Sequence, residues 1–189
     1  MDDTRAIRIL GISGSLRRSS HNTGLLRAAQ ELLPDGVTLT TFDIGQLPHY
    51  NADLDGESAP ESVRALKRAI AEADGLLFVT PEYNYSVPGV LKNAIDWASR
   101  TAKDSPLNGK PVAMMGAGGT MGTVRAQAHL RQILLFNGTM QLAKPEVYIQ
   151  RSWEKFDPDG NLTDEASRKL VRQLLEQFAR WIRQVHQTP

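Results

Sequence analysis

A polar loop near the start of the chain, residues 13–24, carries side chains that can bind an anion. It reads SGSLRRSSHNTG and supplies several hydroxyls, an amide and the guanidinium groups of Arg17 and Arg18. Apolar residues at helical spacing follow it, and the free N–H groups and dipole of a helix start favour negative charge. The loop therefore fits a phosphate cradle. It fits equally well a polar capping turn with surface arginines, in which Asn22 or Thr23 is the N-cap.

Motifs for larger or reactive groups fail in this loop. A triphosphate-binding loop ends in glycine and lysine, and GISGSLRR has no such lysine. A nucleophile elbow needs a glycine where Ser15 stands, and the glycine spacing of a dinucleotide-binding turn is absent. A monophosphate or a similarly small anion fits best.

A second unusual loop, residues 81–88, reads PEYNYSVP. Its two prolines stiffen it, so its backbone N–H and C=O groups suit the edge of a flat heterocycle, such as a flavin or a nucleobase. Tyr83 and Tyr85 either pack along such a ring or are buried or subunit-contact aromatics. We do not assign Glu82 as a general acid or base, because the sequence places no partner carboxylate or histidine near it.

A glycine-rich stretch, residues 116–122, reads GAGGTMG and follows a strand-like run. It has Met121 where the dinucleotide fingerprint requires glycine, so we expect only that it lets a ring or a second ligand approach the backbone. The four histidines show no metal-ligand spacing, and the sequence contains no cysteine for a thiolate site or a nucleophile. We predict no metal site.

These loops must be held by an alternating α/β framework. Apolar strand-like runs without polar alternation are typical of a parallel sheet covered on both faces. Ligands of such sheets bind beyond the carboxyl ends of the strands, which is where all three loops fall. The expected strands are residues 6–12, 37–42, 75–80, 111–115 and a short run near 145–149, and helices are expected at residues 23–33, after PEYNYSVP, and at 61–74, 124–136 and 163–186.

The totals are those of an ordinary globular chain. Of its 189 residues, 41% are hydrophobic and 23% charged, and the formal net charge is +1. We predict a single domain, residues 1–189, without a nucleic-acid or membrane surface. The chain start lacks an apolar stretch of signal-peptide length, which favours a cytoplasmic protein.

Longer stretches around the first two loops resemble a known family. GSLRRSSHN and the later PEYNYSVPGVLKNAIDW are similar to the NADPH-dependent FMN reductases, flavodoxin-like proteins that include quinone, chromate and azo-dye reductases. RAQAHLRQIL and KPE extend the resemblance over nearly the whole chain. It implies a flavodoxin-like three-layer sandwich with a five-stranded parallel sheet in the order 2-1-3-4-5 and helices on both faces.

The resemblance also implies a set of FMN-binding residues. The residues implied for the phosphate are Ser15, Arg17, Ser20, Asn22 and Thr23. The residues implied to line the isoalloxazine ring are Pro81, Glu82, Tyr83, Asn84 and Tyr85. Ala117 and Gly118 would lie against the other side of the flavin, where several relatives have a serine, so backbone contacts are expected there.

The implied reaction is ping-pong hydride transfer from NADPH or NADH to FMN, and then to a small-molecule acceptor such as a quinone, a flavin, an azo dye or chromate. No protein group need act as a nucleophile, so we predict no catalytic residue. Relatives are homodimers or homotetramers with the flavin near the subunit interface. Two alternatives stay open: a flavodoxin-type electron carrier without NAD(P)H turnover, which is usually strongly acidic, and a ligand-free interaction module.

Overall fold

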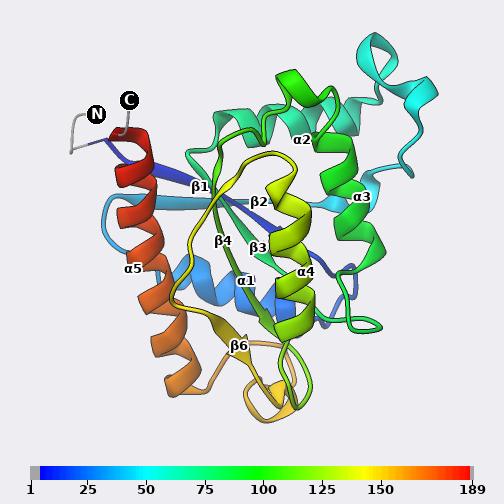
Figure 1. Cartoon of the computed structure of the whole chain (residues 1–189). Coiled ribbons are helices and arrows are strands. Elements are labelled where there is room, and N and C mark those ends of the chain that lie inside the picture. Colours follow the sequence, from blue (N-terminus) through cyan, green and yellow to red (C-terminus); the bar gives the residue numbers. More distant parts are fainter. Residues whose placement is uncertain (1–4, 188–189) are drawn as a thin grey trace.

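One parallel sheet forms the centre of the computed structural model, which describes residues 5–187 (Figure 1). The strands run in the order β2-β1-β3-β4-β5, and β6 also pairs with β4. This confirms the predicted strand order. The remaining residues of the predicted domain, 1–4 and 188–189, lie outside the described residues. The strands are β1 (Ile7–Ser13), β2 (Val37–Phe42), β3 (Gly75–Val79), β4 (Pro111–Ala117), β5 (Met140–Gln141) and β6 (Val147–Ile149).

The fifth position of the sheet differs from the prediction of one short strand near residues 145–149. Two short strands share it: β5 pairs with the start of β4, and β6 pairs with its end. The chain leaves β4 between them, in a segment that contains Pro145. Proline has no N–H to continue the ladder, so it suits this interruption.

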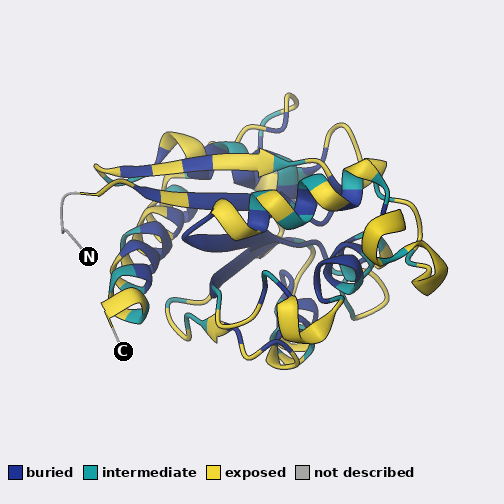
Figure 2. Ribbon diagram, turned by 90° about the horizontal axis from the view of Figure 1, so that it is seen from above, coloured by how far each residue is buried: buried dark blue, intermediate teal, exposed yellow. Residues whose placement is uncertain are grey.

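Helices cover both faces of the sheet, as predicted. They are α1 (His21–Glu31), α2 (Glu61–Glu72), α3 (Gly89–Ala98), α4 (Val124–Leu135) and α5 (Glu165–Gln187). One apolar cluster joins α1 and α5 to one face, and a second joins α2, α3 and α4 to the other. Alternate side chains of the strands feed the two clusters: Leu77 and Val79 enter the first, and Leu76 and Phe78 the second. Figure 2 shows β3 and β4 buried throughout, whereas the edge strand β2 is exposed at alternate positions.

The long segment between β2 and α2 is anchored on α3. It holds three short 3-10 turns, Ile44–Gln46, Ala52–Leu54 and Gly56–Ser58. The indole Nε1 of Trp97 donates to the carbonyl oxygen of Pro48 at 2.8 Å, and Asn93 Nδ2 donates to the same oxygen at 2.9 Å. Trp97 is fully buried there and packs edge-on against Tyr50.

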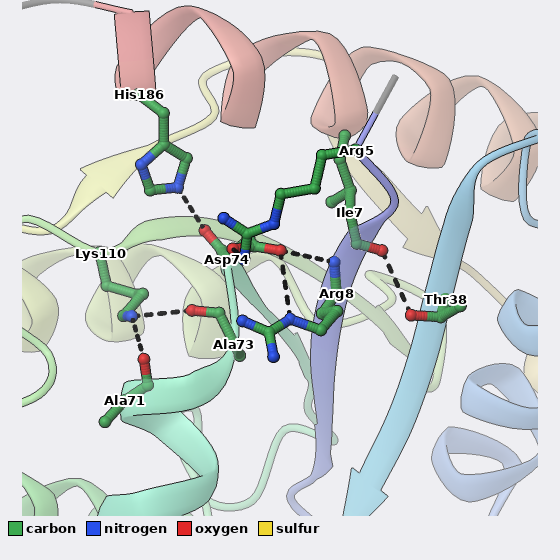
Figure 3. A network of polar contacts seen from close by, with 9 residues as sticks. All are labelled: Arg5, Ile7, Arg8, Thr38, Ala71, Ala73, Asp74, Lys110 and His186. Atoms are coloured by element: carbon green, nitrogen blue, oxygen red, sulfur yellow. Dashed lines mark hydrogen bonds and ion pairs between the residues drawn. The ribbon is translucent and has the colours of Figure 1, made fainter. Parts of the chain in front are cut away.

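A polar network closes the amino edge of the sheet (Figure 3). The Asp74 carboxylate accepts the backbone N–H of Arg8 at 2.8 Å and a guanidinium N–H of Arg5 at 3.3 Å. Lys110 Nζ donates to the carbonyl of Ala73 at 2.8 Å, and His186 Nε2 lies 3.2 Å from the carbonyl oxygen of Asp74. Burial lowers the pKa of Lys110. These bonds join β1, the α2–β3 turn, the start of β4 and the end of α5, at the edge opposite the three predicted loops.

Candidate functional site

The three loops predicted from the sequence meet at the carboxyl edge of the sheet. Gly14 N–H donates to the carbonyl of Val79 at 2.8 Å, which ties the loop after β1 to the end of β3. Thr80 N–H donates to Met115 at 3.0 Å and ties the loop after β3 to β4. Since β1, β3 and β4 are adjacent and parallel, the loops that follow them lie side by side.

The first loop keeps several donors free. Ser20 is the N-cap of α1, and its Oγ accepts the N–H groups of Asn22 at 3.2 Å and Thr23 at 3.4 Å. The prediction of Asn22 or Thr23 as N-cap was therefore wrong, because α1 already begins at His21 and Ser20 caps it. Within the described residues, the backbone N–H groups of residues 16, 18, 19 and 21 have no acceptor, and Arg17 and Arg18 are exposed without an ion pair. This donor set fits a phosphate monoester.

Buried and partly buried hydroxyl and amide groups support the same loop on its inner side. Ser13 Oγ lies 3.0 Å from Thr23 Oγ1, and Ser15 is 9% exposed. The side chain of Asn22 is buried and bonds to both polar groups of the Ala117 backbone. Residues predicted for the phosphate and for the flavin ring are thus in direct contact.

The loop after β3 folds into a tight turn. Tyr83 N–H donates to the carbonyl of Ser86 at 3.0 Å, and Ser86 N–H donates back to Tyr83 at 2.9 Å. Asn84 and Tyr85 between them have φ angles of 49° and 62°, which is the left-handed pattern of a type I′ turn. Tyr83 and Tyr85 are 51% and 66% exposed, so the alternative that they are buried in this chain was wrong. The turn holds both side chains at the surface, where a ligand or another subunit can reach them.

Glu82 fastens this loop to α4. Its carboxylate accepts the backbone N–H groups of Arg125 at 2.9 Å and Ala126 at 3.1 Å, and a guanidinium N–H of Arg125 at 2.9 Å. Burial by itself raises the pKa of Glu82, but these bonds outweigh it and lower the pKa below its ordinary value. The guanidinium of Arg125 also lies 4.0 Å from the centre of the Tyr85 ring. Glu82 is thus held ionised as an anchor, consistent with leaving it unassigned as an acid or base.

The glycine-rich loop is tied to the end of β6. Gly118 N–H donates to Ile149 at 3.0 Å, and the carbonyl of Gly118 accepts the N–H of Ser152 at 2.9 Å. A Cβ on Gly118 would lie 2.3 Å from the carbonyl oxygen of Gly122, so this position requires glycine. The N–H groups of Ala117 and Gly118 are both engaged inside the protein and Gly119 pairs with Gly122, whereas the N–H groups of residues 120 and 121 have no acceptor among the described residues. The free backbone donors of this loop therefore lie just beyond the two residues named from the sequence.

Sequence reasoning missed two supporting contacts. His21 Nδ1 lies 3.0 Å from Ser152 Oγ, and its ring stacks on Phe156 with centroids 4.6 Å apart. Burial, and then the charge of Arg17, lower the pKa of His21. Arg125 was quoted only within RAQAHLRQIL. No spacing signal could identify either contact, because the partners are 131 and 43 residues apart in the chain.

Neither a metal cluster nor a membrane-spanning helix occurs in residues 5–187. No group of three or more His, Asp or Glu side chains in this range is placed to hold a metal ion. No helix in the same range is long and apolar enough to cross a membrane.

A phosphate-sized donor set at the start of α1, beside two stiff loops with free backbone N–H groups, defines a flavodoxin-like mononucleotide-binding protein. Comparison with known proteins narrows this class. The sequence pattern described as NADPH-dependent FMN reductase matches residues 7–154, and the chain belongs to this family. It is an NAD(P)H-dependent oxidoreductase with FMN as its cofactor.

Individual relatives are similar over almost their full length. The NAD(P)H-dependent FMN reductase of Pseudomonas aeruginosa is 47% identical over 180 residues, which are 95% of this chain and 97% of the relative. A 2-hydroxy-1,4-benzoquinone reductase of Burkholderia is 44% identical over 94% of this chain and 97% of its own. The solved structure of FerB, a flavoenzyme NAD(P)H:acceptor oxidoreductase from Paracoccus denitrificans, has a TM-score of 0.86 and 41% identity, and the match covers 95% of this chain and 98% of that chain.

Proposed function

We propose that this protein uses NAD(P)H to reduce quinones, free flavins or related small acceptors. The observation that carries the proposal is the pairing of free donors at the start of α1 with two stiff, donor-bearing loops beside it. The names of the relatives, an FMN reductase and a benzoquinone reductase, support these acceptor classes. Azo dyes and chromate fit the same open site.

The residues present would hold FMN in two parts. Arg17, Ser15 and the free N–H groups at the α1 start would bind the phosphate, and the loops after β3 and β4 would hold the ring. When bound, FMN accepts and donates the hydride. The chain would bind and orient the reacting rings, and the proposed reaction needs no side chain as a nucleophile or a general base.

Replacing Arg17 tests the phosphate site. Arg17→Ala is expected to weaken FMN binding by roughly 1.5–3 kcal/mol, the range for a hydrogen bond to a charged group. Arg172→Ala, on an exposed position of α5, is the matched control and is expected to leave FMN affinity unchanged. Equal affinities of the two variants, measured by flavin fluorescence titration, would show that Arg17 is only a surface residue.

Anaerobic titration separates the enzyme from an electron carrier. NADPH or NADH is expected to bleach the visible absorbance of the bound flavin, and a quinone to restore it. Steady-state NAD(P)H oxidation follows from these two half-reactions. A flavin-containing protein that neither nucleotide reduces would be a carrier, and a protein that takes up no FMN would refute the whole proposal.

We also propose that a second copy of this chain covers the groove between α3 and α4. The groove has a volume of about 540 Å³ and begins at Ser86 of the loop after β3, so an occupant lies next to the ring site. Phe136 lines the groove and is 65% exposed, and the preceding residue, Leu135, is 68% exposed. A twofold-related copy would cover these apolar side chains.

Oligomeric state in solution tests this interface. The unmodified protein is expected to sediment as a dimer or tetramer, and Phe136→Glu to shift it towards a smaller species. Leu170→Glu, at a 40% exposed apolar position on α5, is the matched control and is expected to change nothing. A monomeric unmodified protein, or equal sedimentation of all three proteins, would contradict the proposed interface.

A cytoplasmic location is part of the same proposal, because NAD(P)H is regenerated there, and cell fractionation tests it.

A further inference from the structure

Asn22, the second residue of α1, bridges two loops that do not adjoin in the sheet. Its Nδ2 donates to the carbonyl oxygen of Ala117 at 2.8 Å, and its Oδ1 accepts the N–H of Ala117 at 2.9 Å. One side-chain amide thus pairs both the N–H and the C=O of Ala117, as a neighbouring strand would pair them. Since β3 lies between β1 and β4, the bridge reaches past β3 and links the two loops directly.

The two ends of this bridge are the two halves of the cofactor site. At one end, the backbone N–H of Asn22 donates to the capping Oγ of Ser20, at the phosphate cradle. At the other end, Ala117 is the last residue of β4 and lies within the glycine-rich stretch. His21 makes a parallel link, because its partner Ser152 donates its N–H to Gly118. Two consecutive residues of α1 therefore tie the phosphate cradle to the glycine-rich loop.

The bonds of Asn22 leave it little capacity for a phosphate. The residue is 4% exposed, its Oδ1 and one Nδ2 hydrogen are bonded to Ala117, and its backbone N–H is bonded to Ser20. Only the second Nδ2 hydrogen remains. Loss of the side chain would instead leave the N–H and C=O of Ala117 buried and unpaired, which is costly.

We propose that Asn22 is a positioning residue, which sets the spacing between the phosphate cradle and the ring-binding glycine-rich loop rather than binding the phosphate through its side chain. This inference rests on the proposed FMN site. It predicts that loss of the Asn22 side chain weakens binding of the flavin ring as strongly as binding of the phosphate. Arg17, with its free guanidinium, is expected to act on the phosphate alone.

A comparison of FMN with riboflavin, which lacks only the phosphate, separates the two roles. Asn22→Ala is expected to weaken binding of both ligands by a similar factor, about tenfold, because two hydrogen bonds are lost. The ratio of their dissociation constants then stays that of the unmodified protein, whereas Arg17→Ala lowers the preference for FMN. The visible circular dichroism of bound FMN is expected to change in Asn22→Ala and to be retained in Arg17→Ala.

Selective loss of FMN binding in Asn22→Ala, with riboflavin affinity retained, would overturn the proposal. Reduced stability in urea with both affinities and the flavin spectrum unchanged would overturn it too. If the variant does not fold, the side-chain amide resonance of Asn22 in the unmodified protein decides the question. We expect it to be the same in the FMN and riboflavin complexes, and a difference would assign it to the phosphate. Failure of the unmodified protein to bind either ligand would refute the proposed function instead.

Discussion

Glu82→Gln removes one charge from the anchor between the loop after β3 and the start of α4. The Glu82 side chain is 10% exposed, and its carboxylate accepts three N–H groups from Arg125 and Ala126. The amide of glutamine has nearly the same size, and its oxygen in the place of Oε2 can still accept both backbone N–H groups. It has no charge to pair with the Arg125 guanidinium or to complement the helix start.

The lost interactions set the expected magnitude. A hydrogen bond to a charged group contributes about 1.5–3 kcal/mol, and a carboxylate at a helix start about 0.3–1 kcal/mol. The Arg125 side chain is 38% exposed and can be rehydrated, so the lower ends of both ranges apply. Their sum predicts that the free energy of unfolding falls by about 2 kcal/mol at neutral pH.

The direction of the pKa shift adds a pH dependence. The pKa of Glu82 is lower in the folded chain than its ordinary value, so the ionised carboxylate stabilises the fold above that ordinary value. This stabilisation is lost as the pH falls through the lowered pKa of the folded state. The difference between the unmodified protein and Glu82→Gln is therefore expected to shrink in acid.

Urea unfolding, followed by tryptophan fluorescence at neutral and acidic pH, measures both effects. Glu61→Gln is the matched control, because Glu61 pairs with Arg64 and Arg68 but its side chain is 64% exposed. We expect a much smaller change there, since exposed ion pairs contribute little. If Glu82→Gln costs no more than Glu61→Gln, or if its cost is independent of pH, Glu82 is not the anchor described above.

Two further predictions concern other parts of the chain. Burial, and then the hydrogen bond to Glu146, raise the pKa of Tyr148 to about 12. Glu146→Gln is therefore expected to lower this pKa towards its ordinary value. NMR titration of the Tyr148 ring checks this, and an unchanged pKa would rule out the contribution of Glu146. A Cβ on Gly24 would lie 1.9 Å from the carbonyl oxygen of Gly160, so Gly24→Ala is expected to cost about 1–3 kcal/mol, whereas Gly89→Ala, with open space at the helix start, is expected to be neutral or stabilising by up to about 1 kcal/mol. Similar melting temperatures of the two alanine variants would contradict the packing of Gly24.

The fold was predictable from the sequence because its strands are buried on both faces. Uninterrupted apolar runs such as residues 75–79, repeated between helical patterns, are typical of a covered parallel sheet. The edge strands carry less signal, and the fifth position shows this most clearly. Met140–Gln141 is too short to be predicted as a strand from the sequence. It still pairs with β4, because the preceding turn places it beside that strand.

The candidate site was predictable as a set of loops but not as a set of bonds. Composition and the position of each loop after a strand identified residues 13–24, 81–88 and 116–122. The partners of Asn22 and Glu82 are 95 and 43 residues away, and no local pattern specifies which buried polar group meets which. Their roles as connectors follow only from the three-dimensional arrangement.

These connectors explain which donors remain free. Asn22 engages the N–H of Ala117, Glu82 engages two N–H groups at the start of α4, and Ser20 engages two at the start of α1. Side chains thus satisfy these N–H groups at the strand and helix ends, which would otherwise be free to bind a ligand. Among the described residues, the donors left open lie at the α1 start and at residues 120 and 121, on either side of the Asn22 bridge. A ligand with a phosphate at one end and ring acceptors at the other can satisfy both sets only if the bridge keeps their spacing.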